Sequence, residues 1–213
     1  MNFDGVLEKL ACVNGGSEFD FVVNMAGRRF LVDKVNWYKP KTILQIGTYL
    51  GTAALFLAAA AQEYGGRVVS VDIMDVNADD GPWSKTPSHG RPRDAAIEVG
   101  LDIDFVVDDS VGFLTKYPSV YDMAFLDGDH RHTTVYKELN LLRVNGVILL
   151  HDVFSEDMDI GPGWRKPIRG PWLAMKQFSE ERGAVVESVR NYGSEMVRMG
   201  IVHRGNYGSK RTR

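Results

Sequence analysis

The sequence predicts an α/β protein with a doubly wound, seven-stranded sheet, mostly parallel, that carries helices on both faces and ends in an antiparallel hairpin. Short apolar runs rich in Val and Ile alternate with helical segments, which is the pattern of a parallel sheet. Several of these runs stop abruptly at acidic residues, where a buried strand is expected to end. Two final strand-like runs are joined by a short polar turn, which predicts the hairpin.

The five strands of the parallel part are expected at residues 41–46, 67–71, 103–107, 121–126 and 146–150. The helices between and after them are expected at residues 52–64, 94–99, 110–116, 133–142 and 171–181. Gly65 and Gly66 stop the alanine-rich first of these helices, and Pro171 suits the first turn of the last one. Asp109 or Ser110 can cap the helix that follows the third strand.

The hairpin is expected to pair residues 184–190 with residues 196–203, through a turn at 191–194. Two stretches, residues 77–93 and 155–170, have the Gly, Pro and polar content of long loops. Long loops in compact domains often carry function, so we expect these two to shape the pocket of the substrate.

The length of 213 residues suits one main domain, which we place at residues 40–205. We expect residues 1–39 to form an N-terminal helical segment that covers the sheet edge or the mouth of the ligand site. This segment could also serve as the surface of a homo-oligomer. Residues 206–213 form a basic tail.

Composition limits the partners and the compartment. The net charge of -3 offers no general attraction for nucleic acid, so we expect none to bind. Cys12 is the single cysteine, which fits a reducing compartment. The longest apolar run, residues 53–61, is far shorter than the ~20 residues of a membrane span, and no secretory signal pattern precedes it. The protein is therefore expected to be cytoplasmic and not bound to a membrane.

A glycine turn follows the first expected strand. Gly47 and Gly51 flank it, and glycine lets a backbone turn tightly and a ligand approach closely. Asp72 ends the second strand about twenty residues later, where an acid typically accepts hydrogen bonds from a ribose. The spacing favours a nucleoside-containing ligand, although two such glycines also have a packing explanation. The Gly-x-Gly-x-x-Gly fingerprint of NAD enzymes is absent.

The stretch ILQIGTYLGTAALFLA at residues 43–58 resembles motif I of class I S-adenosylmethionine (SAM)-dependent methyltransferases, above all the small-molecule O-methyltransferases. The runs VVSVDI, VVDDS, FLDGDH and GVILLHD follow in the order of that family's later motifs, so the resemblance covers about residues 41–203. It implies a Rossmann-like fold with SAM as cofactor. The residues that it implies for cofactor binding are Gly47, Thr48, Tyr49 and Gly51 at the methionine part, Asp72 at the ribose, Asp109 and Ser110 near the adenine, and Asp127.

The resemblance also extends to metal-dependent members of the family, the catechol-type and macrolide-sugar enzymes. It implies that Asp127, His151 and Asp152 hold a divalent metal. Through this metal the catalytic Asp127, together with Asp152, would align the acceptor, and His130, three residues after Asp127, would be the catalytic base. An alcohol must lose its proton as it attacks the methyl group, and an imidazole with a pKa near ~6.5 can accept it. Because Mg²⁺ prefers oxygen ligands, His151 leaves three possibilities open: Mg²⁺ held by the two acids and water, Mn²⁺, or no metal.

Other interpretations of these residues remain open at this stage. Gln45 stands where motif I usually has an acid, which removes a charge near the cationic cofactor. Asp127 could be a strand-end cap, His130 a structural hydrogen bonder, and Asp129 a turn residue.

We therefore expect a SAM-dependent O-methyltransferase that acts on a hydroxyl of a small molecule, either a sugar or a secondary metabolite, with help from a divalent metal. The alternatives are an NAD(P)-dependent oxidoreductase and a non-catalytic nucleoside-binding module with the same fold. The sequence does not identify the methyl acceptor.

Overall fold

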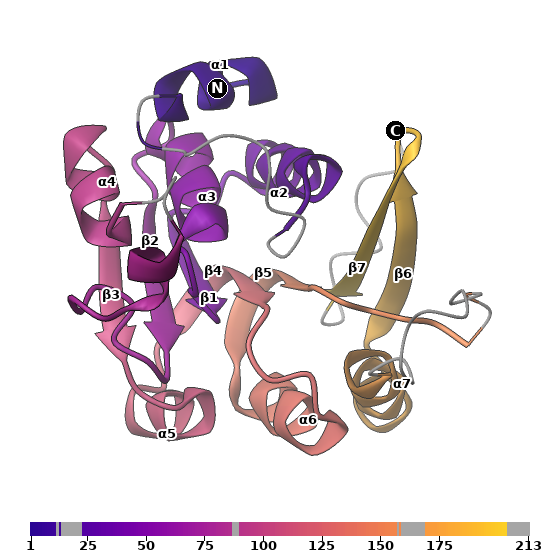
Figure 1. Ribbon diagram of the computed structural model, residues 1–213. Coiled ribbons are helices and arrows are strands. Elements are labelled where there is room, and N and C mark those ends of the chain that lie inside the picture. Colours follow the sequence, from indigo (N-terminus) through magenta and orange to yellow (C-terminus); the bar gives the residue numbers. More distant parts are fainter. Residues whose placement is uncertain (12, 14–22, 87–89, 157, 159–168, 204–213) are drawn as a thin grey trace.

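The computed structural model describes residues 1–11, 13, 23–86, 90–156, 158 and 169–203. Within this part of the chain, seven strands form one sheet in the order β3-β2-β1-β4-β5-β7-β6 (Figure 1). The strands are β1 (Thr42–Ile46), β2 (Arg67–Asp72), β3 (Ile103–Val107), β4 (Val120–Leu126), β5 (Arg143–Leu150), β6 (Val185–Tyr192) and β7 (Glu195–His203). Strands β1 to β5 pair in parallel, whereas β7 is antiparallel to both β5 and β6. The predicted sheet and its terminal hairpin are confirmed.

Helices cover both faces of the sheet, as predicted. They are α1 (Phe3–Leu10), α2 (Met25–Tyr38), α3 (Thr52–Gln62), α4 (Pro92–Glu98), α5 (Ser110–Lys116), α6 (His132–Leu141) and α7 (Gly170–Arg182). Figure 1 shows α1 to α4 on one side of the strands and α5 to α7 on the other. Each helical layer closes its own apolar core, one around Phe56 on α3 and one around Leu139 on α6. The stretch 77–93 contains a short 3-10 helix, Pro82–Lys85, which the sequence pattern did not predict.

The two N-terminal helices belong to the first of these layers. Helix α1 packs on α3, and α2 packs on α3 and on β7 of the hairpin. Asn24 begins α2 by accepting a hydrogen bond from the amide of Gly27 at 2.8 Å. Helices α1 and α2, from the segment expected to cover an edge of the sheet or the ligand mouth, thus lie on one of its faces. The domain boundaries at 39 and 205 stay a prediction, and the basic tail lies outside the described residues.

The register of the central strands brings several polar chain segments to one edge. Ile46 at the end of β1 is paired with Val71 of β2 on one side and Leu126 of β4 on the other. Leu126 is in turn paired with Leu150 of β5. The residues that follow these strand ends therefore lie side by side, where the strand order changes direction and where ligands bind in doubly wound sheets. In the described part of the chain, no helix has the length and apolar character needed to cross a bilayer.

Candidate active site

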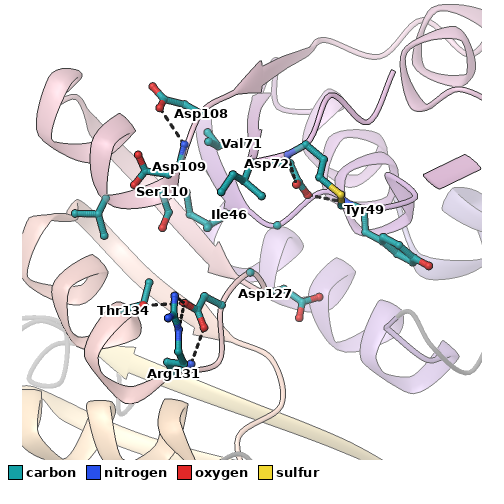
Figure 2. A pocket seen from close by; sticks show the side chains of 16 residues that line it. Ile46, Tyr49, Val71, Asp72, Asp108, Asp109, Ser110, Asp127, Arg131 and Thr134 are labelled. Carbon is teal, nitrogen blue, oxygen red and sulfur yellow. Dashed lines mark hydrogen bonds and ion pairs between the residues drawn. The ribbon is translucent and has the colours of Figure 1, made fainter. Parts of the chain in front are cut away.

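A cavity of about 570 Å³ opens at this edge of the sheet. Its size falls in the range of small-molecule and cofactor sites. Six of the residues expected to bind the cofactor line it: Gly47, Tyr49, Asp72, Asp109, Ser110 and Asp127. Figure 2 shows Asp109 and Ser110 on one side of Ile46, Tyr49 on the other, and Asp127 below. The other two expected residues, Thr48 and Gly51, belong to the same turn.

The glycine turn is shaped by two close approaches. Gly47 has a φ of +87°, and a Cβ added there would lie 2.2 Å from the backbone oxygen of Asp127. Gly51 has a φ of +78°, and its added Cβ would lie 2.5 Å from Cβ of Pro92. Both positions therefore exclude a side chain, for reasons of backbone conformation and of space. These contacts support the packing explanation for both glycines, and Gly47 also lines the cavity.

Asp72 fastens this turn to the end of β2. Its Oδ2 accepts hydrogen bonds from the amides of Thr48 at 2.8 Å and Tyr49 at 3.0 Å, and its Oδ1 accepts one from Met74 at 2.9 Å. The bond from Tyr49 appears as a dashed line in Figure 2. A carboxylate has about four acceptor positions, so three amides still leave capacity for a ribose hydroxyl. Asp72 thus organises the turn in addition to lining the cavity.

Gln45 acts on the same turn from inside the sheet. Its side chain is buried, and Nε2 donates to the carbonyl oxygen of Gly47 at 2.7 Å. A carboxylate at this position would have no proton to donate in that bond. Its Oε1 has no hydrogen-bond partner among the described protein atoms. The amide of Gln45 therefore holds the turn through a bond that the acid usual in motif I could not make.

On the side of the cavity formed by Asp109 and Ser110, the structure contains a buried acid, Glu138, that was not predicted from the sequence. Asp109 caps α5 by accepting from the Gly112 amide at 2.8 Å, and the neighbouring Ser110 is hydrogen-bonded to Glu138 of α6. Glu138 is only 1% exposed, and burial raises its pKa to about 7 although the Ser110 hydrogen bond acts in the opposite direction. The sequence does contain a sign that Glu138 is buried, because Glu138 falls on the apolar stripe of α6 that includes Val135 and Leu139.

The two charged strand ends meet beside the cavity. His151 Nδ1, after β5, lies 3.1 Å from Oδ1 of Asp127, after β4. His130 Nε2 lies 3.6 Å from the same oxygen of Asp127 and 3.8 Å from Oδ2 of Asp152. The structure therefore brings all four residues of the predicted base and metal set into one cluster, which we call the acid–imidazole cluster. Asp129 is not part of it, since Oδ2 of Asp129 bonds to Arg131 at 2.6 Å and to Thr134 at 2.8 Å.

Electrostatic effects within this cluster favour charged side chains. Burial opposes ionisation of Asp127, but His151 and His130 outweigh it and hold the pKa of Asp127 below its usual value. The interaction with the Asp127 carboxylate, 3.6 Å from Nε2, raises the pKa of His130, and burial only partly offsets this. Burial would lower the pKa of His151, yet the charge of Asp127 dominates and raises it. The cluster thus holds an ionised carboxylate between two imidazoles that bind protons more readily than usual.

Arg198, from the middle of β7, contacts the acid–imidazole cluster from outside. Its Nη2 lies 3.3 Å from Oδ1 of Asp152, and its guanidinium stacks over the ring of Phe154 at 5.3 Å. Arg198 and Asp152 have φ values of +48° and +51°, which are uncommon for residues other than glycine. The Arg198 carbonyl accepts from the amide of Val153 at 2.9 Å, so the two strained residues are joined. The hairpin pattern contained no sign that this arginine would reach the site.

The side chains do not fit a divalent metal in this arrangement. Asp127 Oδ1 and His151 Nδ1 are bonded to each other, and because a carboxylate only accepts, that nitrogen carries the proton. A protonated nitrogen does not ligate a metal, so Nδ1 of His151 is excluded as a ligand and only its Nε2 could bind one. Asp152 faces a permanent cation, Arg198. Across the described residues, no three His, Cys, Asp or Glu side chains are grouped so as to hold a metal ion.

Comparison with known proteins places this chain in a family. The family described as "Methyltransferase domain" matches residues 44–153, which span the glycine turn and the acid–imidazole cluster. The mouse (Mus musculus) catechol O-methyltransferase domain-containing protein 1 is 28% identical over 186 residues, or 84% of this chain. The match spans 61% of the length of that mouse protein.

Solved structures share the fold. An O-methyltransferase from Bacillus cereus in complex with SAH superposes with a TM-score of 0.64 at 21% identity, covering 93% of this chain and 88% of the other. The O-methyltransferase TomG from Streptomyces achromogenes, in complex with SAM, gives a TM-score of 0.63 at 17% identity, covering 93% and 90%. The chain therefore belongs to the methyltransferase domain family, and its fold is that of class I SAM-dependent O-methyltransferases.

Proposed function

We propose that this chain transfers a methyl group from SAM to a hydroxyl oxygen of a small molecule, such as a sugar or a secondary metabolite. The observation that carries the proposal is the contact between a cofactor-sized cavity and the acid–imidazole cluster, which share Asp127. Because the chain spans 61% of its mouse relative, the activity and the acceptor of the whole protein are part of this proposal.

The lining of the cavity suits the parts of SAM. The turn with Gly47, Thr48, Tyr49 and Gly51 would face the methionine part, and its glycines keep side chains out of the way. Asp72 would accept from the ribose, while Asp109 and Ser110 would lie near the adenine. SAM supplies a methyl group made electrophilic by a sulfonium, and the protein supplies position and electrostatics.

His130 is the proposed general base. Its Nε2 has no hydrogen-bond partner in the described protein, which leaves this nitrogen available to accept the hydroxyl proton of the acceptor. The carboxylates of Asp127 and Asp152 lie within 3.8 Å of it and stabilise the imidazolium that forms. Holding the acceptor oxygen in line with the methyl group supplies much of the remaining rate.

Metal assistance by Mg²⁺ or Mn²⁺ is left out of this mechanism, because the predicted ligands Asp127, His151 and Asp152 bond to groups of the chain itself. The cytoplasmic location and a homo-oligomeric state also stay predictions.

Titration calorimetry with S-adenosylhomocysteine tests the proposal. We expect saturable binding, and an Asp72→Ala variant should bind at least tenfold more weakly, since the turn and the ribose contact are both lost. NAD(P) in place of S-adenosylhomocysteine should give no binding. Binding of NAD(P) alone would favour an oxidoreductase, and binding of neither would contradict a nucleoside cofactor.

An acceptor screen separates an enzyme from a non-catalytic binding module. Purified protein and SAM are incubated with a panel of sugars and phenolic or alcoholic metabolites, and S-adenosylhomocysteine formation is followed by mass spectrometry. Turnover with at least one hydroxyl compound, abolished when that hydroxyl is replaced by hydrogen, is the expected result. Turnover that persists with the deoxy compound would contradict O-methylation.

A further inference from the structure

Arg198 places a permanent positive charge beside the carboxylate of Asp152. It comes from β7, the antiparallel strand next to β5, and its side chain is 22% exposed. Its guanidinium is fixed on two sides, by Asp152 at 3.3 Å and by the ring of Phe154 at 5.3 Å. An arginine stays protonated throughout the physiological pH range, so this charge is constant.

The position of Arg198 affects whether the carboxylates of Asp127 and Asp152 can bind a divalent cation. Within the acid–imidazole cluster, the carboxylates of Asp127 and Asp152 carry the side-chain oxygens that hard divalent cations prefer. One carboxylate faces Arg198 and the other accepts a hydrogen bond from His151 at 3.1 Å. A cation placed between them would meet the guanidinium at close range, and like charges repel strongly where side chains are partly buried.

The backbone keeps Arg198 in this position. Its φ of +48° is matched by +51° at Asp152, and the Val153 amide bonds to the Arg198 carbonyl at 2.9 Å. Left-handed backbone outside glycine costs about 1–2 kcal/mol per residue and persists where the surroundings hold it. A simple exposed ion pair between two loops would not require such a backbone at both partners.

We infer that Arg198 takes the place of a divalent metal at this centre: its guanidinium neutralises Asp152 and stabilises negative charge that develops on the acceptor oxygen. This inference rests on the proposed function for the identity of that oxygen. The exclusion of a metal by Arg198 depends only on the side chains of the cluster.

Binding of Mn²⁺ tests the inference without knowledge of the acceptor. Electron paramagnetic resonance titration with Mn²⁺ is carried out on the wild type, Arg198→Gly, Arg198→Lys and Arg67→Ala. Glycine suits the φ of +48° at position 198, so that variant is expected to fold. Arg67 is a matched control, because it pairs with Asp104 at 3.3 Å on an exposed surface outside the cluster.

We expect the wild type, Arg198→Lys and Arg67→Ala to bind Mn²⁺ weakly, and Arg198→Gly to bind it at least tenfold more tightly. Lysine retains the charge and glycine removes it, so the difference between them reports charge and not shape. Wild-type binding as tight as that of Arg198→Gly would overturn the inference, and so would equally weak binding by all four proteins.

S-adenosylhomocysteine affinity is measured on the same four samples. Unchanged affinity in Arg198→Gly shows that its fold and cofactor site are intact. If no sample binds S-adenosylhomocysteine, the proposed function fails, whereas the Mn²⁺ comparison still decides whether Arg198 excludes the metal.

Discussion

His130 lies between two carboxylates, and this sets the pH at which it can work. The interaction with the Asp127 carboxylate at 3.6 Å raises its pKa above the ordinary value of 6.5. Below that raised pKa the imidazole is protonated and does not accept a proton, so kcat/KM should fall as the pH drops through it. The acidic limb of the pH–rate profile is therefore expected above pH 6.5.

Replacement of His130 by Ala should cut turnover by about a hundredfold or more and leave S-adenosylhomocysteine affinity nearly unchanged. The measurements are kcat with an acceptor from the screen and calorimetry with the cofactor product. His132→Ala, two residues away at the start of α6, is the matched control and should keep both values. An equal loss of turnover and affinity in the His130 variant would indicate a structural role.

Glu138 makes stability depend on pH. It is buried against Ser110, and its pKa rises from 4.5 to about 7 on folding. The folded protein therefore holds a proton over a pH range in which the unfolded chain has lost it. The contribution of Glu138 to the free energy of unfolding is therefore largest below pH 4.5. It falls by about 3 kcal/mol in total as the pH rises to about 7.

The variant Glu138→Gln removes this titration and keeps the shape of the side chain. Relative to the wild type, it should be about 3 kcal/mol more stable near pH 8 than near pH 4.5. Urea unfolding at the two pH values measures the difference, and Glu98→Gln on the exposed face of α4 should show none. A Glu138 variant whose relative stability does not change with pH would refute the raised pKa.

At the scale of elements, the glycine turn joins β1 to α3 and lies against the end of β4. Gly47 and Gly100 have left-handed φ values of +87° and +65°, but only Gly47 has neighbours, with Asp127 O at 2.2 Å from an added Cβ. Alanine substitutions at these two glycines therefore distinguish the free-energy cost of a left-handed backbone from the cost of a steric clash.

Gly100→Ala should cost about 1–2 kcal/mol of unfolding free energy, the conformational term alone. Gly47→Ala should cost clearly more and weaken S-adenosylhomocysteine binding at least tenfold, because the end of β4 must move away from the turn. Chemical unfolding and calorimetry compare the two variants. Similar stability and full binding in both would show that the contact between turn and strand is dispensable.

At the scale of the whole molecule, the N-terminal helices share a core with the sheet. Phe30 of α2 is 1% exposed and packs edge-on against Tyr192 of the hairpin, with 5.5 Å between ring centroids. The first and last parts of the described chain are thereby joined across the same apolar layer (Figure 1). We expect the N-terminal segment and the sheet to unfold together.

Phe30→Ala should lower the unfolding free energy by about 3–5 kcal/mol and keep a single cooperative transition. Trp37→Ala, at a 66% exposed position of the same helix, should change it by less than about 0.5 kcal/mol. Circular dichroism during thermal unfolding measures both. Two separate transitions in the Phe30 variant would mean that the N-terminal segment folds independently.

Local pattern was sufficient to predict much of this protein. The alternation of strands and helices, the glycine turn and the acids after β4 and β5 are properties of neighbouring residues, and parallel strands bring their carboxyl ends to one edge. The meeting of Asp127, His130, His151 and Asp152 could thus be predicted before any coordinates. The strand boundaries were predicted less closely. Strand β5, for example, begins at Arg143, three residues before the expected start.

The sequence by itself thus determined the fold class, the cofactor edge and the charged strand ends, because each follows from short-range periodicity and turn chemistry. Only the tertiary structure decided which polar groups from distant parts of the chain contact these strand ends and the cofactor edge. Arg198 reaches Asp152 because β7 inserts between β5 and β6, and Glu138 reaches Ser110 because α6 packs on α5. Both contacts depend on the order in which strands and helices pack, a long-range property that no local pattern encodes.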